Sequence, residues 1–268
     1  MPSRRSAPRR RRRRRTPWEK VRRVGIAAVV AAAYVESIRL VRVRPRELAL
    51  GVPTIWGWVR RAFPPATGEI GVLSYRAAQT AAIALVGTSI AAVLALLVCL
   101  PAARNVSRNP LVRLPARLLL NGLRGIDSFV FALLFVVAVG LGPFAGVLGI
   151  AFHTWGSMGK LFSETIEGLP RGPMEAAELT GASRFKVALF TTLRDAMPGL
   201  ASVGLYLLEF NVRASTVLGI VGAGGIGQDL KNSLDLLDFP RLATIVAVIL
   251  VMVTAIDQLS SALRRSLG

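Results

Sequence analysis

Long stretches of the chain carry almost no charged side chains. A helix needs about 20 mostly apolar residues to cross the hydrocarbon core of a bilayer. Hydrophobic residues make up 53% of the 268 residues, and the mean hydropathy is +0.52. This composition predicts an all-α integral membrane protein of about six transmembrane helices rather than a soluble domain. The expected spans are Val24–Val41, Ala77–Leu100, Ser128–Leu141, Phe144–Ile166, Pro198–Val221 and Leu242–Leu263.

Two of these spans are expected to be irregular. The stretch Ser128–Leu141 is short, and we expect it to begin nearer Leu118 as a re-entrant or interfacial segment. The stretch Val24–Val41 contains Glu36 and Arg39, and a signal peptide with a basic region at 4–23 and an apolar region at 26–33 is the competing interpretation. We favour a span, because no small-residue cleavage site precedes a soluble domain.

The basic residues are unevenly distributed. We predict that residues 1–23 form a basic, disordered cytoplasmic tail, and that the transmembrane domain covers 24–268. The unbroken run Arg9–Arg15 accounts for a large part of the net charge of +19. Beside a membrane span, attraction to anionic lipid headgroups is a simpler role for this run than a nucleic-acid-binding arm, so we expect no nucleic acid partner.

The remaining charges predict an orientation. The segments at 101–127 and 170–194 hold more lysines and arginines than the loops expected on the opposite side. Cytoplasmic loops are enriched in these residues. We therefore predict a multi-pass protein of the cytoplasmic (inner) membrane of a bacterium, with both termini in the cytoplasm.

Residues 170–193 predict a compact helical elbow. Pro170 and Pro173 end the preceding helix and start a new one, from Met174 to Thr180. Gly181 is expected to end that helix in the left-handed conformation. Ser183 can then cap a second short helix that ends near Leu193, and Pro198 is expected to begin a longer apolar helix.

The elbow and the stretch after it resemble known transport proteins. Glu175-Ala176-Ala177 followed by Gly181 is similar to the coupling motif of importer-type ABC permeases, and Glu209–Gln228 resembles the signature of phosphonate-type permeases. The resemblance extends from about Val72 to the C-terminus. It differs at Arg194, where the family pattern has a proline.

The resemblance implies a fold and a set of partners. It implies a type I (MetI-like) permease core that works as a homodimer with two ATPase subunits and an extracytoplasmic binding protein. ATP and Mg would be bound by the ATPase, so this chain would need no cofactor and would not be an enzyme. The solute would be phosphonate or a related oxyanion such as phosphate or phosphite. The implied coupling residues are Glu175, Ala176, Ala177, Gly181, Ala182 and Arg184.

Two expected spans carry polar residues in helical register. His153, Ser157, Lys160, Glu164 and Glu167 share one face of the fourth span, and Ser202, Tyr206, Glu209, Arg213 and Thr216 share one face of the fifth. Two helices that each carry one polar seam suggest a bundle interior or a translocation path between them. The path candidates are Lys160, Glu164, Tyr206, Glu209, Asn211, Arg213, Ser215 and Thr216.

The charged pairs on these faces allow two interpretations. Lys160 with Glu164, and Glu209 with Arg213, are spaced to neutralise each other within one helix, which is the structural interpretation. In the alternative, Arg213 meets an anionic substrate. The structural interpretation is favoured, because specificity in such systems is expected to lie mainly in the binding protein.

A glycine cluster follows the fifth span. Gly222, Gly224 and Gly227 match the G-x-G-x-x-G pattern of a dinucleotide site, with Gly225 between them. The helical register before the cluster and the apolar span after it argue against a βαβ unit. We expect these four glycines to form a tight turn at the outer mouth of the permease.

The sequence offers no catalytic or metal-binding set. Cys99 and His153 are the only residues of their kinds, and Gly159-Lys160 lacks the other residues of a P-loop. A non-transporting scaffold that holds anionic lipid or nucleic acid through its arginine tail is the alternative to a permease.

Overall fold

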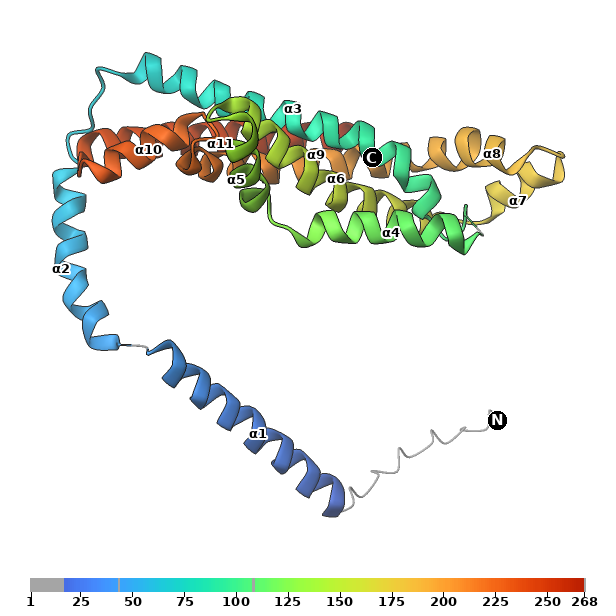
Figure 1. Ribbon diagram of the computed structural model, residues 1–268, viewed down its shortest axis with the longest axis horizontal. Coiled ribbons are helices and arrows are strands. Elements are labelled where there is room, and N and C mark those ends of the chain that lie inside the picture. Colours follow the sequence, from blue (N-terminus) through green and yellow to red (C-terminus); the bar gives the residue numbers. More distant parts are fainter. Residues whose placement is uncertain (1–16, 43, 108, 268) are drawn as a thin grey trace, which may run out of the picture. The chain divides into compact units, whose positions relative to one another are not determined.

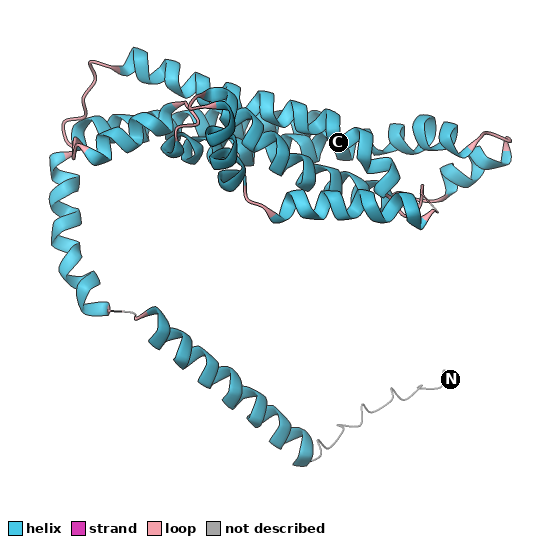
Figure 2. Ribbon diagram, viewed as in Figure 1, coloured by secondary structure: helices cyan, strands magenta, loops and turns pink. Residues whose placement is uncertain are grey.

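The computed structural model describes residues 17–42, 44–107 and 109–267, and these residues are helical apart from turns and loops (Figures 1 and 2). The chain divides into two compact units, residues 1–57 and 58–268. The arginine run Arg9–Arg15 lies outside the described residues.

The first unit holds α1 (Pro17–Val41) and most of α2 (Pro45–Arg61). Helix α1 starts at Pro17, inside the segment 1–23 that the sequence analysis assigned to the tail. The predicted span Val24–Val41 is helical. However, α1 is not among the described segments that qualify as membrane spans by length and composition.

The second unit is a bundle built around two long helices, α3 (Ile70–Ala102) and α6 (Pro143–Glu167). The other elements are α4 (Pro110–Gly125), α5 (Ser128–Val139), α7 (Gly172–Leu179), α8 (Arg184–Lys186), η1 (Val187–Thr192), α9 (Leu193–Leu218), η2 (Gly219–Val221), α10 (Ile226–Asp235) and α11 (Phe239–Leu267).

Three described segments qualify as membrane spans by length and composition: Ile70–Ala102, Val187–Val221 and Phe239–Ser266. They contain the predicted second, fifth and sixth spans. The predicted third span is broken, because α4 and α5 meet at a bend of 86° and count at most as one span together. This bend agrees with the predicted re-entrant or interfacial segment near Leu118.

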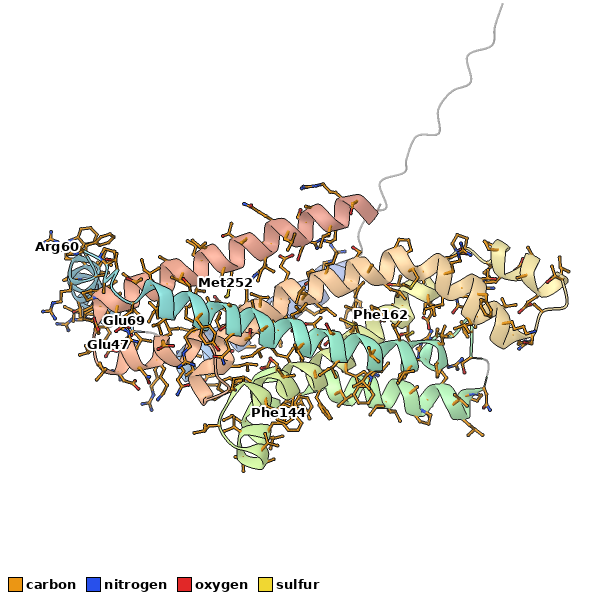
Figure 3. The ribbon with its side chains drawn as sticks, turned by 90° about the horizontal axis from the view of Figure 1, so that it is seen from above. Glu47, Arg60, Glu69, Phe144, Phe162 and Met252 are labelled. Atoms are coloured by element: carbon orange, nitrogen blue, oxygen red, sulfur yellow. The ribbon has the colours of Figure 1, made fainter. Side chains whose placement is uncertain are left out.

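Helix α6 coincides with the predicted fourth span but is too polar to qualify as a span by composition. Its position inside the protein explains why polar residues are tolerated there. Phe162 is buried among the neighbouring helices, whereas Phe144 at the start of α6 is exposed (Figure 3). A helix that other helices surround can carry His153 and Lys160, because its polar groups meet protein rather than lipid.

Small residues allow the helices to pack closely. A Cβ on Gly149 would lie 2.9 Å from Cα of Ala132 on α5, and a Cβ on Gly156 would lie 2.8 Å from the Leu120 carbonyl oxygen on α4. Such small residues are common where membrane helices touch, because they let the backbones approach.

The prediction that Pro198 begins a helix is wrong. The helical chain runs without interruption from Arg184 through the π-helical turn η1 into α9, and Pro198 lies inside α9. A proline in a helix removes one backbone hydrogen bond. Here the helix continues through that defect, and Leu200 and Leu207 pack in the core on its far side.

Candidate coupling and translocation site

The elbow between α6 and α9 has the predicted conformation. Gly181 has φ +78°, and its N–H donates to the Glu178 carbonyl oxygen over 3.0 Å. This confirms the left-handed end of the first elbow helix. Ser183 occupies the N-cap position of α8, but its side chain makes no capping hydrogen bond.

The elbow presents an exposed surface. Glu175, Ala176, Gly181 and Arg184 are exposed, whereas Ala177 and Ala182 are half-buried. Leu179, which the sequence analysis missed, is 90% exposed. An apolar side chain at the tip of a charged elbow is suited to burial against another protein.

The helical segment that follows the elbow is longer than a membrane span requires. The segment Val187–Val221 has 35 residues, which is about 52 Å at 1.5 Å per residue. The hydrocarbon core is only about 30 Å thick. The segment is thus about 20 Å longer than the core is thick, and the elbow lies at one end of it (Figure 1).

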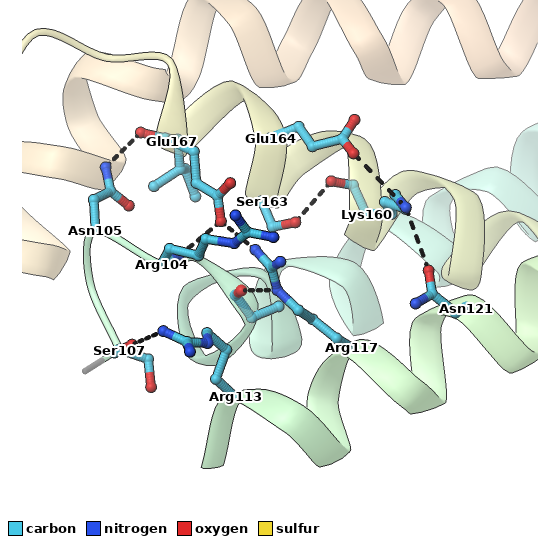
Figure 4. Close-up of polar contacts among 12 residues, drawn as sticks. Arg104, Asn105, Ser107, Arg113, Arg117, Asn121, Lys160, Ser163, Glu164 and Glu167 are labelled. Atoms are coloured by element: carbon cyan, nitrogen blue, oxygen red, sulfur yellow. Dashed lines mark hydrogen bonds and ion pairs between the residues drawn. The ribbon is translucent and has the colours of Figure 1, made fainter. Parts of the chain in front are cut away.

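The polar face of α6 lies against α4 (Figure 4). Nζ of Lys160 is 3.4 Å from Oδ1 of Asn121 and 3.8 Å from Oε1 of Glu164. Glu167 pairs with Arg117 of α4. At the other end of the face, Nδ1 of His153 is 2.8 Å from the Ile126 carbonyl oxygen, just past the end of α4.

The polar face of α9 lies against α11. Glu209 pairs with Arg213 over 2.6 Å and with Arg264 over 2.9 Å, and Arg213 also lies 3.3 Å from Asp257. The sequence analysis missed Asp257 and Arg264, although charges in an apolar span were the available signal. Tyr206 is exposed, and Thr216 donates to the backbone of Arg213.

The charged side chains of the two polar seams therefore pair with other helices and not with each other. Each seam is paired with a different helix, α4 or α11, because register defines a face but not the neighbour of that face. The i, i+4 pairs Lys160–Glu164 and Glu209–Arg213 both form, as the structural interpretation predicted.

Helices α6 and α9 meet instead at a small buried polar cluster. Nδ2 of Asn211 is 2.8 Å from the Thr88 hydroxyl of α3 and 3.0 Å from the Thr154 hydroxyl of α6. Asn211 is 1% exposed. Ser215, one turn further on, donates to the Thr80 carbonyl oxygen over 3.1 Å. Asn211 and Ser215 thus tie three helices together, and the sequence analysis missed their threonine partners.

The glycine cluster forms a tight loop between α9 and α10. Gly222, Gly224 and Gly225 have φ of +85°, +77° and +77°, which non-glycine residues rarely adopt. The loop is held to α3, since the Ile226 N–H donates to the Thr80 hydroxyl over 2.8 Å. The stretch before the loop, 216–221, is helical and not a strand, so the cluster lacks the context of a dinucleotide site.

Comparisons with known proteins agree with one another. A family model described as "Binding-protein-dependent transport system inner membrane component" matches residues 95–268. HtxC of Stutzerimonas stutzeri, named as a phosphite transport system permease protein, is 46% identical over 241 residues, which is 90% of this chain and 84% of that protein.

Two further relatives have related names. The phosphite transport system permease protein PtxC of Stutzerimonas stutzeri is 41% identical over 80% of this chain and 78% of its own length. The phosphate-import permease protein PhnE of Mycolicibacterium smegmatis is 38% identical over 93% of this chain, which spans 47% of that longer protein.

Solved structures share the fold. The methionine ABC transporter MetNI in an inward-facing conformation has a TM-score of 0.66 at 20% identity, covering 76% of this chain and 99% of that chain. An amino acid ABC transporter has a TM-score of 0.59 at 17% identity, covering 70% of this chain and 90% of that one. The core of the second unit is therefore a MetI-like permease fold.

Proposed function

Because the chain belongs to the family of binding-protein-dependent transport system inner membrane components, we propose that it is the permease of an ATP-driven importer for phosphorus oxyanions. The observation that carries the substrate class is the extent of the similarity to permeases named for phosphite and phosphate, which covers most of this chain. Phosphonate, phosphite and phosphate share a tetrahedral phosphorus with charged oxygens.

The partners in this proposal follow from the fold and the family. Two copies of the chain would form the path, two ATPase subunits would bind ATP and Mg, and an extracytoplasmic binding protein would deliver the oxyanion. The termini of the chain and the elbow would face the cytoplasm. The membrane is the bacterial inner membrane, which fits the family and the apolar helices.

In the proposal, the elbow couples the ATPase to the bundle. Glu175, Gly181 and Arg184 are exposed, and Leu179 projects beside them. Movement of the ATPase subunits would displace the elbow, and α9 would transmit that displacement because the helical chain is continuous from Arg184 to Leu218. A conformational change of this kind needs different contacts in its two states, and the elbow surface can supply them.

The path itself would lie where polar residues reach the permease interior. Asn211, Ser215 and Thr216 lie on α9, and Tyr206 and Arg213 are exposed on the same helix. The glycines 222, 224, 225 and 227 would form the outer mouth, since their loop lies at the end of α9 away from the elbow. Lys160, Glu164 and Glu209 are in ion pairs, which favours structural roles for them.

The test is ATP hydrolysis by the purified complex in lipid. We compare the unchanged chain with Gly181→Val and Glu175→Lys, with and without a binding protein loaded with phosphonate, phosphite or phosphate. Valine in the left-handed region costs about 1–3 kcal/mol, so the elbow should distort. We expect loaded binding protein to raise turnover several-fold in the unchanged complex and not in the variants.

The matched control is Gly172→Ala. Gly172 lies on the same elbow, has no positive φ, and has open space where a Cβ would stand. This variant should keep the stimulation. If Gly181→Val and Glu175→Lys also keep it, the coupling role is wrong, and if no phosphorus oxyanion on the binding protein stimulates turnover, the substrate class is wrong.

A further inference from the structure

A cavity of about 210 Å³ lies between α4 and α6, near the elbow. Its walls carry three cationic side chains, Arg104, Arg117 and Lys160, and two carboxylates, Glu164 and Glu167. Figure 4 shows these side chains around one space, with Arg104 in the loop between α3 and α4. The cavity thus has an excess of one positive charge.

The two carboxylates differ in how firmly they are held. Glu167 pairs with Arg117 and also accepts the Arg104 backbone N–H over 2.7 Å, so it is fixed. Glu164 is 3.8 Å from Lys160, and its side chain is 54% exposed. A contact of that length on an exposed pair contributes little, and Lys160 can exchange it for a better acceptor.

Arg104 has no carboxylate of its own. Its backbone binds Glu167, but in the described part of the chain its guanidinium makes neither an ion pair nor a hydrogen bond. The guanidinium fork presents parallel N–H donors, which match the oxygens of a phosphate group. Lys160 and the Asn121 amide supply further donors on the same walls.

We propose that this cavity binds a phosphate-class tetrahedral oxyanion, held by Arg104, Lys160 and Arg117. The ligand supplies the negative charge that the walls lack, and it meets donors from both α4 and α6. Two sources carry the same chemistry: free inorganic phosphate and the phosphodiester headgroup of an anionic lipid. The site does not depend on which solute the permease transports.

The proposed oxyanion site lies next to the elbow. Arg104 also lines a neighbouring cavity with Asn105, Arg171 and Glu175, so one residue borders both the proposed site and the elbow. Occupation of the site therefore bears on the conformation of the elbow.

The test measures binding of inorganic phosphate to the full chain, in its complex, in nanodiscs of neutral phosphatidylcholine. Phosphate is titrated against chloride at matched ionic strength, and binding is followed by the rise in the thermal unfolding midpoint. Arg104→Gln and Lys160→Gln should each weaken phosphate binding about tenfold or more, since each removes a charge-assisted hydrogen bond.

The matched control is Arg124→Gln, which removes an exposed charge from α4 outside the cavity lining. It should leave the phosphate affinity unchanged. A second arm uses nanodiscs with phosphatidylglycerol and counts retained lipids by native mass spectrometry. If the headgroup is the natural ligand, this lipid competes with phosphate and is retained in smaller number by Arg104→Gln.

Two results would overturn the site. One is the absence of both saturable phosphate binding and Arg104-dependent lipid retention. The other is an equal loss of binding in Arg104→Gln and Arg124→Gln, which would show a general effect of surface charge. Arg104→Gln removes an exposed side chain, so without phosphate its thermal unfolding midpoint should match that of Arg124→Gln. This comparison distinguishes a loss of binding from a loss of folding.

Discussion

Gly227, in the first turn of α10, is the glycine of the cluster with the least room for another side chain. A Cβ there would overlap the Thr216 carbonyl oxygen and lie 2.9 Å from Cα of Gly219. Both neighbours are backbone atoms at the end of α9, so they cannot turn aside. We expect Gly227→Ala to destabilise the protein by about 1–3 kcal/mol, the usual cost of overpacking, measured as thermal unfolding in detergent.

Gly204 provides the matched control within α9. It has ordinary helical geometry, and a Cβ would meet no atom within 4 Å. Alanine in place of a helical glycine stabilises by about 0.5–1 kcal/mol. Gly204→Ala should therefore raise the midpoint while Gly227→Ala lowers it, and a similar shift in both would show that close packing at Gly227 is unimportant.

Asn211 links α3, α6 and α9 through Thr88 and Thr154. Hydrogen bonds between membrane helices contribute about 0.6 kcal/mol on average and up to about 1.7 kcal/mol. A double-mutant cycle with Asn211→Ala and Thr154→Val should give a coupling energy in this range. The same cycle with Asn211→Ala and Thr180→Ala, which lies on the elbow at the far end of the long helix, should give none. A coupling energy near zero in the first cycle would show that the Asn211–Thr154 hydrogen bond does not stabilise the core.

At the scale of the element, Pro198 shows where the sequence analysis failed. Proline is tolerated at a helix start, and that rule placed the start of the fifth span at Pro198. The observed helix begins upstream and passes through the proline. The sequence could not reveal this, because the decision rests on burial of Ala196 and Leu200 against α3 and α6, which only the assembled bundle determines.

The position of Pro198 inside α9 predicts the effect of replacing this proline. Pro198→Ala restores a backbone N–H in the interior of α9, where its acceptor would be the Arg194 carbonyl oxygen. Pro198 is exposed, so little packing is lost. We expect a gain of about 1 kcal/mol or more in the free energy of unfolding, measured by thermal unfolding in detergent. A loss of stability would mean that the proline fixes a bend that the bundle requires.

For the polar faces of α6 and α9, the sequence predicted ion pairs within each helix but not ion pairs between helices. Spacing placed Lys160 with Glu164 and Glu209 with Arg213 correctly, because these pairs lie within one helix. It could not show that Glu167 meets Arg117 or that Glu209 meets Arg264, because those contacts join residues 50 and 55 positions apart. Local register is visible in the sequence, and the neighbour of each face is not.

At the scale of the whole molecule, three of the six predicted spans qualify by length and composition in the described part of the chain. The segments Ile70–Ala102, Val187–Val221 and Phe239–Ser266 are apolar enough to span, and the sequence predicted each of them. Helix α6 was also predicted as a span but is too polar to qualify, and buried residues lie along its whole length. Its polar residues are tolerated because α4 supplies partners for them, so hydropathy alone cannot decide whether it spans.

The orientation of the whole molecule can be tested through the one cysteine of the chain. Cys99 is fully buried, so the unchanged chain should resist a membrane-impermeant maleimide in intact cells and serve as the unlabelled control. Thr180→Cys places a thiol on the elbow, and Asn232→Cys places one on α10. Both positions are exposed.

The charge distribution predicts which of these thiols reacts. Arg104, Arg113, Arg117, Arg171, Arg184 and Lys186 lie in or near the elbow end, whereas Lys231 and Arg241 lie at the α10 end. Because cytoplasmic segments are enriched in such residues, Asn232→Cys should be labelled in intact cells, and Thr180→Cys only after the membrane is permeabilised. Labelling of Thr180→Cys from outside would reverse the orientation and leave the elbow without access to a cytoplasmic ATPase.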